Sequence, residues 1–503
     1  MLTFIIVRKG KEGRPRSGPP GPPGLPLLGN LLSLHPDLHS YFAHLTRTYG
    51  PIFQLRFGNK LAIVVSSPAL AKEVLRDNDV VFANRDVPAV GLLISYGGCN
   101  IVSSPYGAVW RMLRRVCIQE MLSKATMDSV YSLRRSEVRG AVGRLYANAT
   151  AGRAVSVGEE MFLVMMNVIT SMLWGGIVLD GEERSGVRAE FRKVVSQITE
   201  MLSKPNISDF FPVLAPLDLQ GMERKMKNLF LKLDGLFETI IDRRVRRNTT
   251  EKDEGNSSSC CEGGKDFLQF LLRIKEERDA ETPMTMAHLK ALLMDMLVGG
   301  TETTANTMEW AIAHLMEKPN TMRKVQVELD AVAGTCDIIE EAHLPKLHYL
   351  AAVVKEVLRL HPALPLLVPH CPSQTCTVGG YTIAKGARVF VNVWAIQRDP
   401  LMWENASEFD PDRFVATQNN CDYSGGDFGY FPFGSGRRMC AGIAMAERMV
   451  LYGLASVLHS FEWHLPEGAE LDLSEKFGMV LKKAKPLEAI PTPRLSDPNL
   501  YTV

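Results

Sequence analysis

The chain has 503 residues, of which 46% are hydrophobic and 22% charged, so it contains enough apolar side chains for a large core. Its 57 lysines and arginines balance 56 aspartates and glutamates, which argues against the basic surface of a nucleic-acid-binding protein. The nine cysteines are scattered without a Cys-x-x-Cys pair, which argues against a disulfide scaffold and favours a reducing, cytosol-facing compartment.

The N-terminus joins a short apolar stretch to a basic and then a proline-rich one. MLTFIIV is shorter than the about 20 apolar residues that span a bilayer, and RKGKEGRPR follows it. We expect either the remaining end of a membrane anchor or a short disordered tail. SGPPGPPGLPLLG should form a stiff, polyproline-like spacer. Residues 1–35 are therefore assigned to anchor and hinge, and residues 36–503 to one domain.

The first part of this domain combines helical patterns with one hairpin signal. LHSYFAHLTRTYG has apolar residues at helical spacing and ends at Gly50. The strand-like segments PIFQLRF and LAIVVSS flank Gly58-Asn59, which predicts a β-hairpin. Residues 87–107 are apolar and glycine-rich without a period, so we expect a long functional loop there.

Later segments predict a mostly helical body with a small sheet region. The prolines and apolar residues of 207–221 suggest a lid or a turn that touches a membrane. Beyond residue 375, TCTVGGYTIAKGARVFVNV predicts short strands. The fold class expected from these patterns is mainly α.

The longest helical pattern, residues 284–318, contains two adjacent glycines. Its acidic residues, such as Asp295, indicate the central helix of a core rather than a membrane span. Gly299 and Gly300 each cost roughly 1 kcal/mol relative to alanine. Such glycines are tolerated where a neighbour approaches the backbone closely or where the helix opens locally.

Polar side chains follow these glycines directly. Glu302 stands next to the hydroxyl groups of Thr301 and Thr303. An acid beside hydroxyl groups can pass protons into an apolar cavity. The alternative is a helix kink with polar residues at a packing interface.

A second helical segment, AAVVKEVLRLHP, carries a charged pair on one face. Glu356 and Arg359 are three residues apart, and the surrounding residues are apolar. A partly buried pair needs further partners, and Arg413 of FDPDRF offers one. We expect a structural network of these three side chains.

A single cysteine stands in the sequence FGSGRRMCAG, residues 433–442, just before a helical run. Cys440 has no cysteine or histidine at the spacing of a zinc site. A lone thiolate can instead be the axial ligand of haem iron. The N-terminus of the following helix favours the thiolate, and the glycines allow the backbone to approach a flat cofactor.

These segments together resemble the cytochrome P-450 superfamily of haem-thiolate monooxygenases. FGSGRRMCAG fits the signature F-x-x-G-x-R-x-C-x-G, and the resemblance covers residues 19–490. The proline hinge, W-x-x-x-R at Trp110 and Arg114, GGTETT, Glu-x-x-Arg and PDRF occur in the family's order. The chain is particularly similar to plant microsomal A-type members that hydroxylate flavonoids or sesquiterpenes. The resemblance implies the P-450 fold, a large helical body around haem b with a smaller β-sheet region.

The resemblance also implies roles for individual residues. Cys440 would be the proximal iron ligand, and Phe433 would shield its sulfur. Thr303 with Glu302, beside Gly300, would deliver protons to dioxygen. The remaining cofactor contacts would be the propionate-binding residues and the two loop glycines, namely Trp110, Arg114, His370, Arg438, Gly436 and Gly442.

The substrate pocket would lie under the loop 87–107 and have an apolar wall, which suits a lipophilic small molecule. The wall is expected to include Leu293, Leu297, Val298, Leu364, Leu366, Leu367, Phe477, Met479 and Val480.

The implied reaction is insertion of one oxygen atom from O2 into a lipophilic plant metabolite. No flavin or nicotinamide fingerprint is present, so electrons would come from NADPH through a cytochrome P-450 reductase in the endoplasmic reticulum membrane, the catalytic domain facing the cytosol. The basic residues around the cysteine loop and Trp110, namely Arg111, Arg115 and Arg437, could meet an acidic surface of this partner. The alternatives are a haem-thiolate isomerase or dehydratase that needs no O2, and a non-catalytic haem-binding protein.

Overall fold

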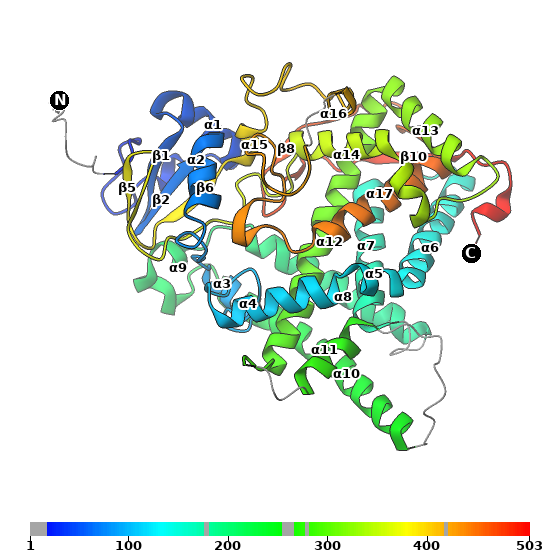
Figure 1. Cartoon of the computed structure of the whole chain (residues 1–503), viewed down its shortest axis with the longest axis horizontal. Coiled ribbons are helices and arrows are strands. Elements are labelled where there is room, and N and C mark those ends of the chain that lie inside the picture. Colours follow the sequence, from blue (N-terminus) through cyan, green and yellow to red (C-terminus); the bar gives the residue numbers. More distant parts are fainter. Residues whose placement is uncertain (1–17, 176–180, 254–265, 277–280, 417–420, 503) are drawn as a thin grey trace.

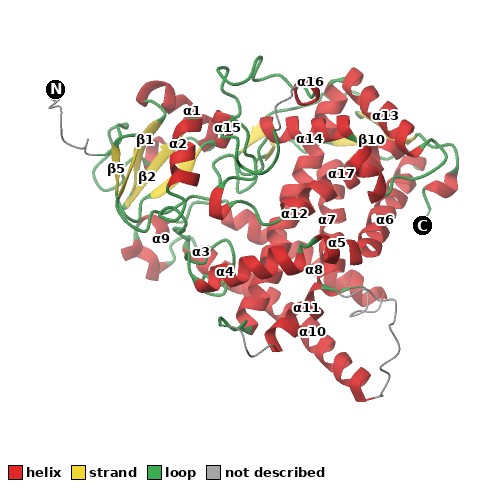
Figure 2. Ribbon diagram, viewed as in Figure 1, coloured by secondary structure: helices red, strands yellow, loops and turns green. Residues whose placement is uncertain are grey.

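The computed structural model describes residues 18–175, 181–253, 266–276, 281–416 and 421–502. The predicted anchor up to residue 17 lies outside the described residues. Figure 1 shows a helical body around α12 (Met286–Glu317), and Figure 2 shows that strands gather at the end that carries β1 (Ile52–Phe57) and β2 (Lys60–Val65).

The other helices of at least eight residues are α1 (Leu38–Tyr49), α4 (Ala108–Arg115), α6 (Tyr131–Thr150), α7 (Val157–Trp174), α8 (Gly181–Leu202), α10 (Met222–Asp253), α11 (Phe267–Glu276), α13 (Pro319–Ala333), α14 (His348–Leu360) and α17 (Ile443–Ser460). The shorter helices are α2 (Pro68–Lys72), α3 (Ala89–Ile94), α5 (Lys124–Ser129), α9 (Ile207–Phe210), α15 (Val393–Ile396) and α16 (Asp412–Ala416). The remaining strands are β3 (Val155–Ser156), β4 (Cys376–Val378), β5 (Tyr381–Ile383), β6 (Arg388–Val391), β7 (Phe461–His464), β8 (Glu475–Lys476), β9 (Lys482–Lys483) and β10 (Glu488–Pro493).

The predicted hairpin forms one edge of a three-stranded sheet. β1 and β2 pair antiparallel with Phe57 opposite Lys60, and β6 adds parallel to β2. Gly58 has a φ of 57° in the turn, where glycine meets no steric cost. The proline-rich stretch lies against this sheet, since the Gln54 N–H donates to the Pro20 carbonyl over 2.8 Å.

The long glycine-containing helix is present as α12 and is continuous. It begins at the N-cap Thr285, whose hydroxyl accepts from the His288 N–H over 3.2 Å. A Cβ atom at Gly300 would lie 2.7 Å from the side chain of Ile169 on α7. Close approach of α7 therefore explains Gly300, and no local opening of the helix is needed.

Among the described residues, α7 is the one helix long and apolar enough to cross a membrane. Two thirds of it, 67%, is buried inside the protein, where it packs against α12. This apolar composition is accounted for by the core.

The segment 87–107, expected to be a loop throughout, contains the short helix α3. Val90 and Ile94 of this helix are buried in the main core cluster. Tertiary packing thus imposes a helix on a stretch without a helical period. Tyr96, Gly97 and Gly98 follow with φ angles of 52°, 75° and 90°, and they reverse the chain towards α4.

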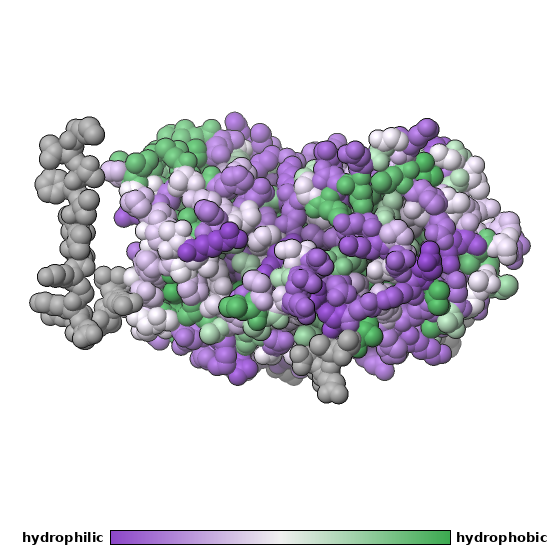
Figure 3. Space-filling view, turned by 90° about the horizontal axis from the view of Figure 1, so that it is seen from above, coloured by the Kyte–Doolittle hydropathy of each residue, from purple (hydrophilic) through white to green (hydrophobic). Residues whose placement is uncertain are grey.

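The segment 207–221 forms α9 and a 3₁₀ turn beside the β1–β2 hairpin. The Asn59 N–H donates to the Phe210 carbonyl over 3.1 Å. Val213, Leu217 and Leu219 are 86%, 64% and 60% exposed. Figure 3 shows hydrophobic residues on the surface at this sheet-containing end of the molecule.

Candidate active site

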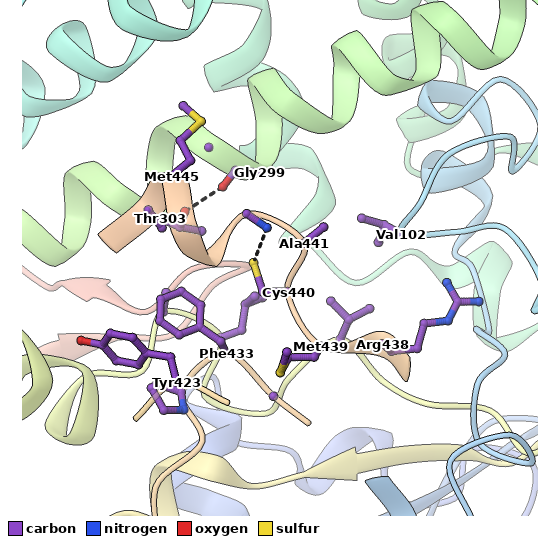
Figure 4. Close-up of a pocket in the computed structure, with 18 of the residues that line it drawn as sticks. Val102, Gly299, Thr303, Tyr423, Phe433, Arg438, Met439, Cys440, Ala441 and Met445 are labelled. Atoms are coloured by element: carbon purple, nitrogen blue, oxygen red, sulfur yellow. Dashed lines mark hydrogen bonds between the residues drawn. The ribbon is translucent and has the colours of Figure 1, made fainter. Parts of the chain in front are cut away.

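A largely apolar cavity of about 290 Å³ lies between α12 and the segment that carries Cys440. In Figure 4 the Cys440 sulfur points towards the part of α12 that carries Gly299 and Thr303. The lining combines side chains of the cysteine loop, α12, α14 and the segment 363–370. The cavity therefore brings together residues that are far apart in the sequence.

The cysteine loop fixes its sulfur through backbone contacts. The Cys440 N–H donates to the Phe433 carbonyl over 3.0 Å, and the Gly442 N–H donates to the Cys440 sulfur over 3.3 Å. Gly442 is the N-cap of α17, so the sulfur lies at the positive end of this helix. The ring of Phe433 lies beside the sulfur and packs edge-on against Tyr423 at 5.0 Å.

The exposed surface of Cys440 belongs to the lining of this cavity. Burial raises the pKa of the Cys440 thiol, while the Gly442 N–H and the charge of Arg114 oppose this rise. The thiolate form thus needs a further positive charge at the sulfur. A metal ion bound from the cavity side supplies such a charge.

Two further loop glycines are explained by different neighbours. Gly436 has a φ of 69°, and a Cβ atom there would lie 1.9 Å from the Leu75 carbonyl oxygen. Contact with the turn that contains Leu75 therefore requires this glycine, rather than contact with a cofactor. Gly434, with a φ of 76°, lines the cavity and was not singled out by the sequence analysis.

The cavity contains an excess of positive charge. Arg85, Arg114 and Arg438 line it, and none of them forms an ion pair with a carboxylate within the described parts of the chain. Burial lowers the pKa of Arg85 to about 9, and the charge of Arg438 adds to this shift. The pKa of Arg438 is lowered to about 10 by burial and by Arg114. Guanidinium groups in such surroundings fit an anionic partner that enters the cavity.

Arg85 gives the clearest sign of a missing partner. Its terminal nitrogen donates to the Val368 carbonyl over 2.6 Å, yet its Nε is buried without a hydrogen-bond partner among the described residues. The cysteine, the apolar walls and these arginines together fit haem, which combines iron with two carboxylates. Sequence reasoning missed Arg85 because no local motif marks it.

The predicted propionate ligands lie around one end of the cavity. Trp110 does not line it and donates its indole N–H to the Ile101 carbonyl over 3.1 Å. The guanidinium of Arg438 lies 4.7 Å from the Trp110 ring and also donates to Ile101, over 2.8 Å. Arg114 lies 5.6 Å from the same ring.

His370 lines the cavity, but its hydrogen bond restricts its role. Its Nδ1 lies 2.9 Å from the Phe82 carbonyl, so this nitrogen carries the proton. Burial and the charges of Arg85 and Arg438 lower the pKa of His370, which favours the neutral ring. Its Nε2 is then an acceptor, and binding of a propionate there requires the imidazolium form.

The residues of the GGTETT motif separate into two groups. Thr303 lines the cavity, and its hydroxyl donates to the Gly299 carbonyl over 2.7 Å. Glu302 does not line the cavity but forms an ion pair with the half-exposed Lys482 of β9. The acid and the hydroxyl that the sequence analysis paired therefore lie on different sides of α12.

Comparison with known proteins was made for the whole chain. The sequence profile of the family described as Cytochrome P450 matches residues 19–490. The chain belongs to the cytochrome P450 family. This result confirms the predicted family, the mainly α fold, and the class of enzyme, a monooxygenase that contains haem iron.

Plant enzymes are among its similar relatives. A flavonoid 3'-monooxygenase from Crocosmia x crocosmiiflora is 38% identical and covers 98% of this chain and 96% of its own. A carnosic acid synthase from Rosmarinus officinalis is 36% identical over 96% of this chain and 94% of its own. A solved zebra fish cytochrome P450 with progesterone has a TM-score of 0.75 and 26% identity, over 92% of this chain and 100% of that one.

The walls of this P450 cavity differ from the predicted set. Of the nine expected residues, Leu364 and Leu367 line the cavity. On α12 the lining residues are instead Asp295, Met296, Gly299, Gly300, Thr303, Thr304 and Thr307. The predicted residues that lie outside the lining are Leu293, Leu297, Val298, Leu366, Phe477, Met479 and Val480.

These predicted residues lie outside the cavity lining because each element turns a different face towards the cavity. Leu293 and Leu297 are fully buried within the main core cluster. Leu366 packs in a separate cluster at the sheet end, and Phe477 stacks on His39 at 5.6 Å. Apolar character alone did not distinguish these core positions from cavity positions.

The three charged residues predicted to form a network lie together at α14, which also lines the cavity. Arg359 donates to both oxygens of Glu356 over 2.7 and 2.8 Å, and both side chains are 0% exposed. Arg413 adds a contact of 3.2 Å to Glu356. Arg359 also donates to the carbonyls of Gln397 and Ala406, so it joins α14 to the segment that leads to the cysteine loop.

Proposed function

We propose that this P450 hydroxylates a lipophilic flavonoid or terpenoid, with haem b ligated by Cys440 and with electrons from NADPH through a cytochrome P450 reductase. The observation that carries this proposal is the Cys440 sulfur facing a cavity with three arginines that have no carboxylate partner among the described residues. The named activities of the plant relatives support the substrate class.

Haem bound in this cavity supplies the iron at which one atom of O2 is transferred to a C–H bond. The chain's own residues act around it. Arg85, Arg114 and Arg438 neutralise the cofactor's carboxylates, and Phe433 excludes water from the Cys440 sulfur.

Proton supply is assigned to Thr303, whose hydroxyl lines the cavity. This hydroxyl is bonded to the Gly299 carbonyl, and it can exchange that bond for one to a water molecule in the cavity. In this proposal Glu302 receives protons from the solvent side, which the 51% exposure of its partner Lys482 supports.

A reductase surface is proposed on the face that carries Trp110. Arg111, Arg115 and Arg437 line a shallow depression there and are exposed. Arg437 shares its charge with Asp79 at 3.1 Å, whereas no ion pair involves Arg111 or Arg115 among the described residues. An acidic partner surface is complementary to this charge.

Attachment to the endoplasmic reticulum membrane is proposed for the sheet-containing end. Leu27 and Val213 are 85% and 86% exposed there, and Leu32 is 74% exposed. The Leu28 carbonyl accepts from the Gly58 N–H of the hairpin turn, which also contacts Phe210. Two exposed apolar segments thus meet at one turn, as a membrane-facing surface requires.

The test is the reduced carbon-monoxide spectrum of Cys440→His. We expect loss of the strongly red-shifted Soret band that a thiolate ligand produces. Cys117→Ala is the matched control, since Cys117 also lines the cavity and should leave the band unchanged. A red-shifted band that survives in Cys440→His would falsify the ligation.

Turnover with a plant reductase tests the reaction. Flavonoids and terpenoids that shift the Soret band should yield hydroxylated products only when NADPH and O2 are supplied. Product formation without NADPH would favour the isomerase or dehydratase alternative, and binding without turnover would favour a non-catalytic haem protein.

A further inference from the structure

One acidic side chain in the cavity wall has no part in the functions assigned above. Asp295 lies on the cavity face of α12 together with Met296, Gly299 and Thr303. Its side chain is partly exposed, and the surface that it presents belongs to the cavity lining. An ionisable carboxyl group in a mostly apolar cavity is costly, so its presence calls for a partner.

The protein satisfies only part of the hydrogen-bonding capacity of this carboxyl group. One oxygen accepts from the Asn100 amide over 2.7 Å, and the other accepts from the Ile101 N–H over 2.7 Å. Each carboxylate oxygen can accept two hydrogen bonds, so one acceptor position remains on each. No lysine, arginine or histidine forms an ion pair with Asp295 within the described residues.

The charge state of Asp295 suits recognition of a hydroxyl group. Burial raises the pKa of Asp295 to about 7, while the bonds from Asn100 and Ile101 oppose this rise. Cys117 is the titratable group that faces it, and the Asp295 charge contributes to the raised pKa of that thiol. The carboxyl group therefore accepts from a hydroxyl group when ionised and donates to it when protonated.

The position of Asp295 along α12 determines its distance from Thr303. Eight positions separate it from Thr303, which corresponds to about 12 Å of helix axis. Apolar side chains such as Val102 and Leu364 line the cavity as well. A bound molecule that spans this distance has one polar end at Asp295 and its oxidised carbon near Thr303.

We propose that Asp295 is the substrate-anchoring residue of this P450: its carboxyl group hydrogen-bonds a phenol or alcohol group of a lipophilic ring compound about 12 Å along α12 from Thr303. The inference rests on the proposed function and narrows its substrate class. A compound with a hydroxyl group remote from the oxidised carbon is bound in preference to its deoxy analogue.

The competing role for Asp295 is a purely structural one, because its carboxyl group also holds the roof segment 98–104. The two roles differ in their effect on matched ligands. Loss of a structural tether weakens every ligand alike, whereas loss of an anchor weakens only the ligand with the hydroxyl group.

The experiment compares two probe pairs by Soret titration of the haem-loaded protein. The first pair is flavanone and 7-hydroxyflavanone, and the second is abietatriene and 12-hydroxyabietatriene. In the unmodified protein we expect the hydroxylated member of at least one pair to bind about tenfold more tightly, which corresponds to one charge-assisted hydrogen bond.

Asp295→Leu should reduce this tenfold preference to about onefold, because the hydroxylated ligand loses its hydrogen bond in addition to any weakening that both members of a pair share. Tyr96→Phe is the matched control, since it removes a roof tether that ends on Asp234 rather than on Asp295 and should preserve the preference. If Asp295→Leu does not fold, the proposal is tested with Asp295→Ala and by whether the unmodified protein prefers the hydroxylated ligand. Absence of a preference in both pairs, through equal binding or through no binding, overturns the anchor.

The reduced carbon-monoxide spectrum separates this outcome from failure of the proposed function. A red-shifted band with NADPH-dependent turnover but no hydroxyl preference removes the anchor alone. A preference that survives in Asp295→Leu assigns recognition to another residue and also overturns the anchor.

Discussion

The two sides of the cavity are held by different kinds of contact. On one side, the base, Glu356 and Arg359 are 0% exposed, and their bonds join α14 to the segment before the cysteine loop. On the other side, aspartates tie the roof 87–107 to its neighbours through one or two hydrogen bonds each. The base is therefore held by a buried network, whereas the aspartates that hold the roof belong to different elements.

The aspartates that contact the roof belong to three separate elements. Asp209 of α9 accepts from the Ala89 N–H over 2.8 Å, and Asp295 of α12 accepts from the Ile101 N–H over 2.7 Å. Asp234 of α10 accepts from the Tyr96 hydroxyl over 2.6 Å. The comparison teaches that one cavity combines a rigid base with a roof whose attachments are separable, and the following predictions test it.

Arg359→Leu should have the largest effect on stability. It leaves Glu356 buried without its main partner, which costs about 3–5 kcal/mol of unfolding free energy. Urea unfolding and haem retention measure the loss. Arg413→Leu is the control, since Arg413 makes one longer contact to Glu356 and is 11% exposed. Equal losses in both variants would contradict a base centred on Arg359.

The pH dependence of stability should reveal Asp295. Its pKa is about 7 in the folded protein and 3.8 ordinarily, so the folded state binds more protons between these values. The contribution of Asp295 to the free energy of unfolding is therefore largest below about pH 4. It falls as pH rises to about 7 and is constant above that. The change is on the order of 4 kcal/mol.

Asp295→Asn should flatten this part of the curve, measured by chemical unfolding from pH 4.5 to 8. The reference is the unmodified protein over the same range. An unchanged slope would show that Asp295 does not titrate in this window.

Thr303→Ala should lower the rate of product formation by roughly 10²-fold, the lower end of general acid catalysis. Peroxide release per NADPH should rise, because reduced oxygen that does not receive the proton for cleavage of its O–O bond leaves as hydrogen peroxide. Thr301→Ala is the control, since its hydroxyl donates to Leu297 within the core. Unchanged coupling in Thr303→Ala argues against the proton role.

Tyr96→Phe should have the smallest effect. It removes one hydrogen bond to Asp234, worth about 1 kcal/mol, and keeps the ring that packs against Phe230 at 4.9 Å. Substrate association and dissociation, followed by stopped-flow Soret changes, should both become faster. Tyr106→Phe is the control on the same segment, and equal rates in all three proteins would show that the roof is not gated at Tyr96.

The sequence predicted the base better than the roof, for a physical reason. The cysteine loop and Glu-x-x-Arg are short motifs whose residues act close to one another along the chain. The hairpin at Gly58 and the long helix α12 follow from turn chemistry and periodicity. These features are local, so a single sequence contains the information for them.

Most features that depend on distant contacts were not predicted, although the contact of Arg413 with Glu356 was. Arg85 acquires its role because folding places it beside Arg438, and Asp295 because α12 turns that face to the cavity. The helix has apolar residues on both sides, so its orientation could not be read from composition. In the same way α3 forms because Val90 and Ile94 are buried.

Gly436 has a consequence for how the two ends of the molecule are coordinated. Because the Leu75 carbonyl occupies the space of a side chain there, the chain just ahead of Cys440 rests directly on the turn that follows α2. The position of the Cys440 sulfur therefore depends on a contact with the strand-rich end of the molecule. A methyl group added at residue 436 would displace the sulfur, although neither residue 436 nor Leu75 lines the cavity.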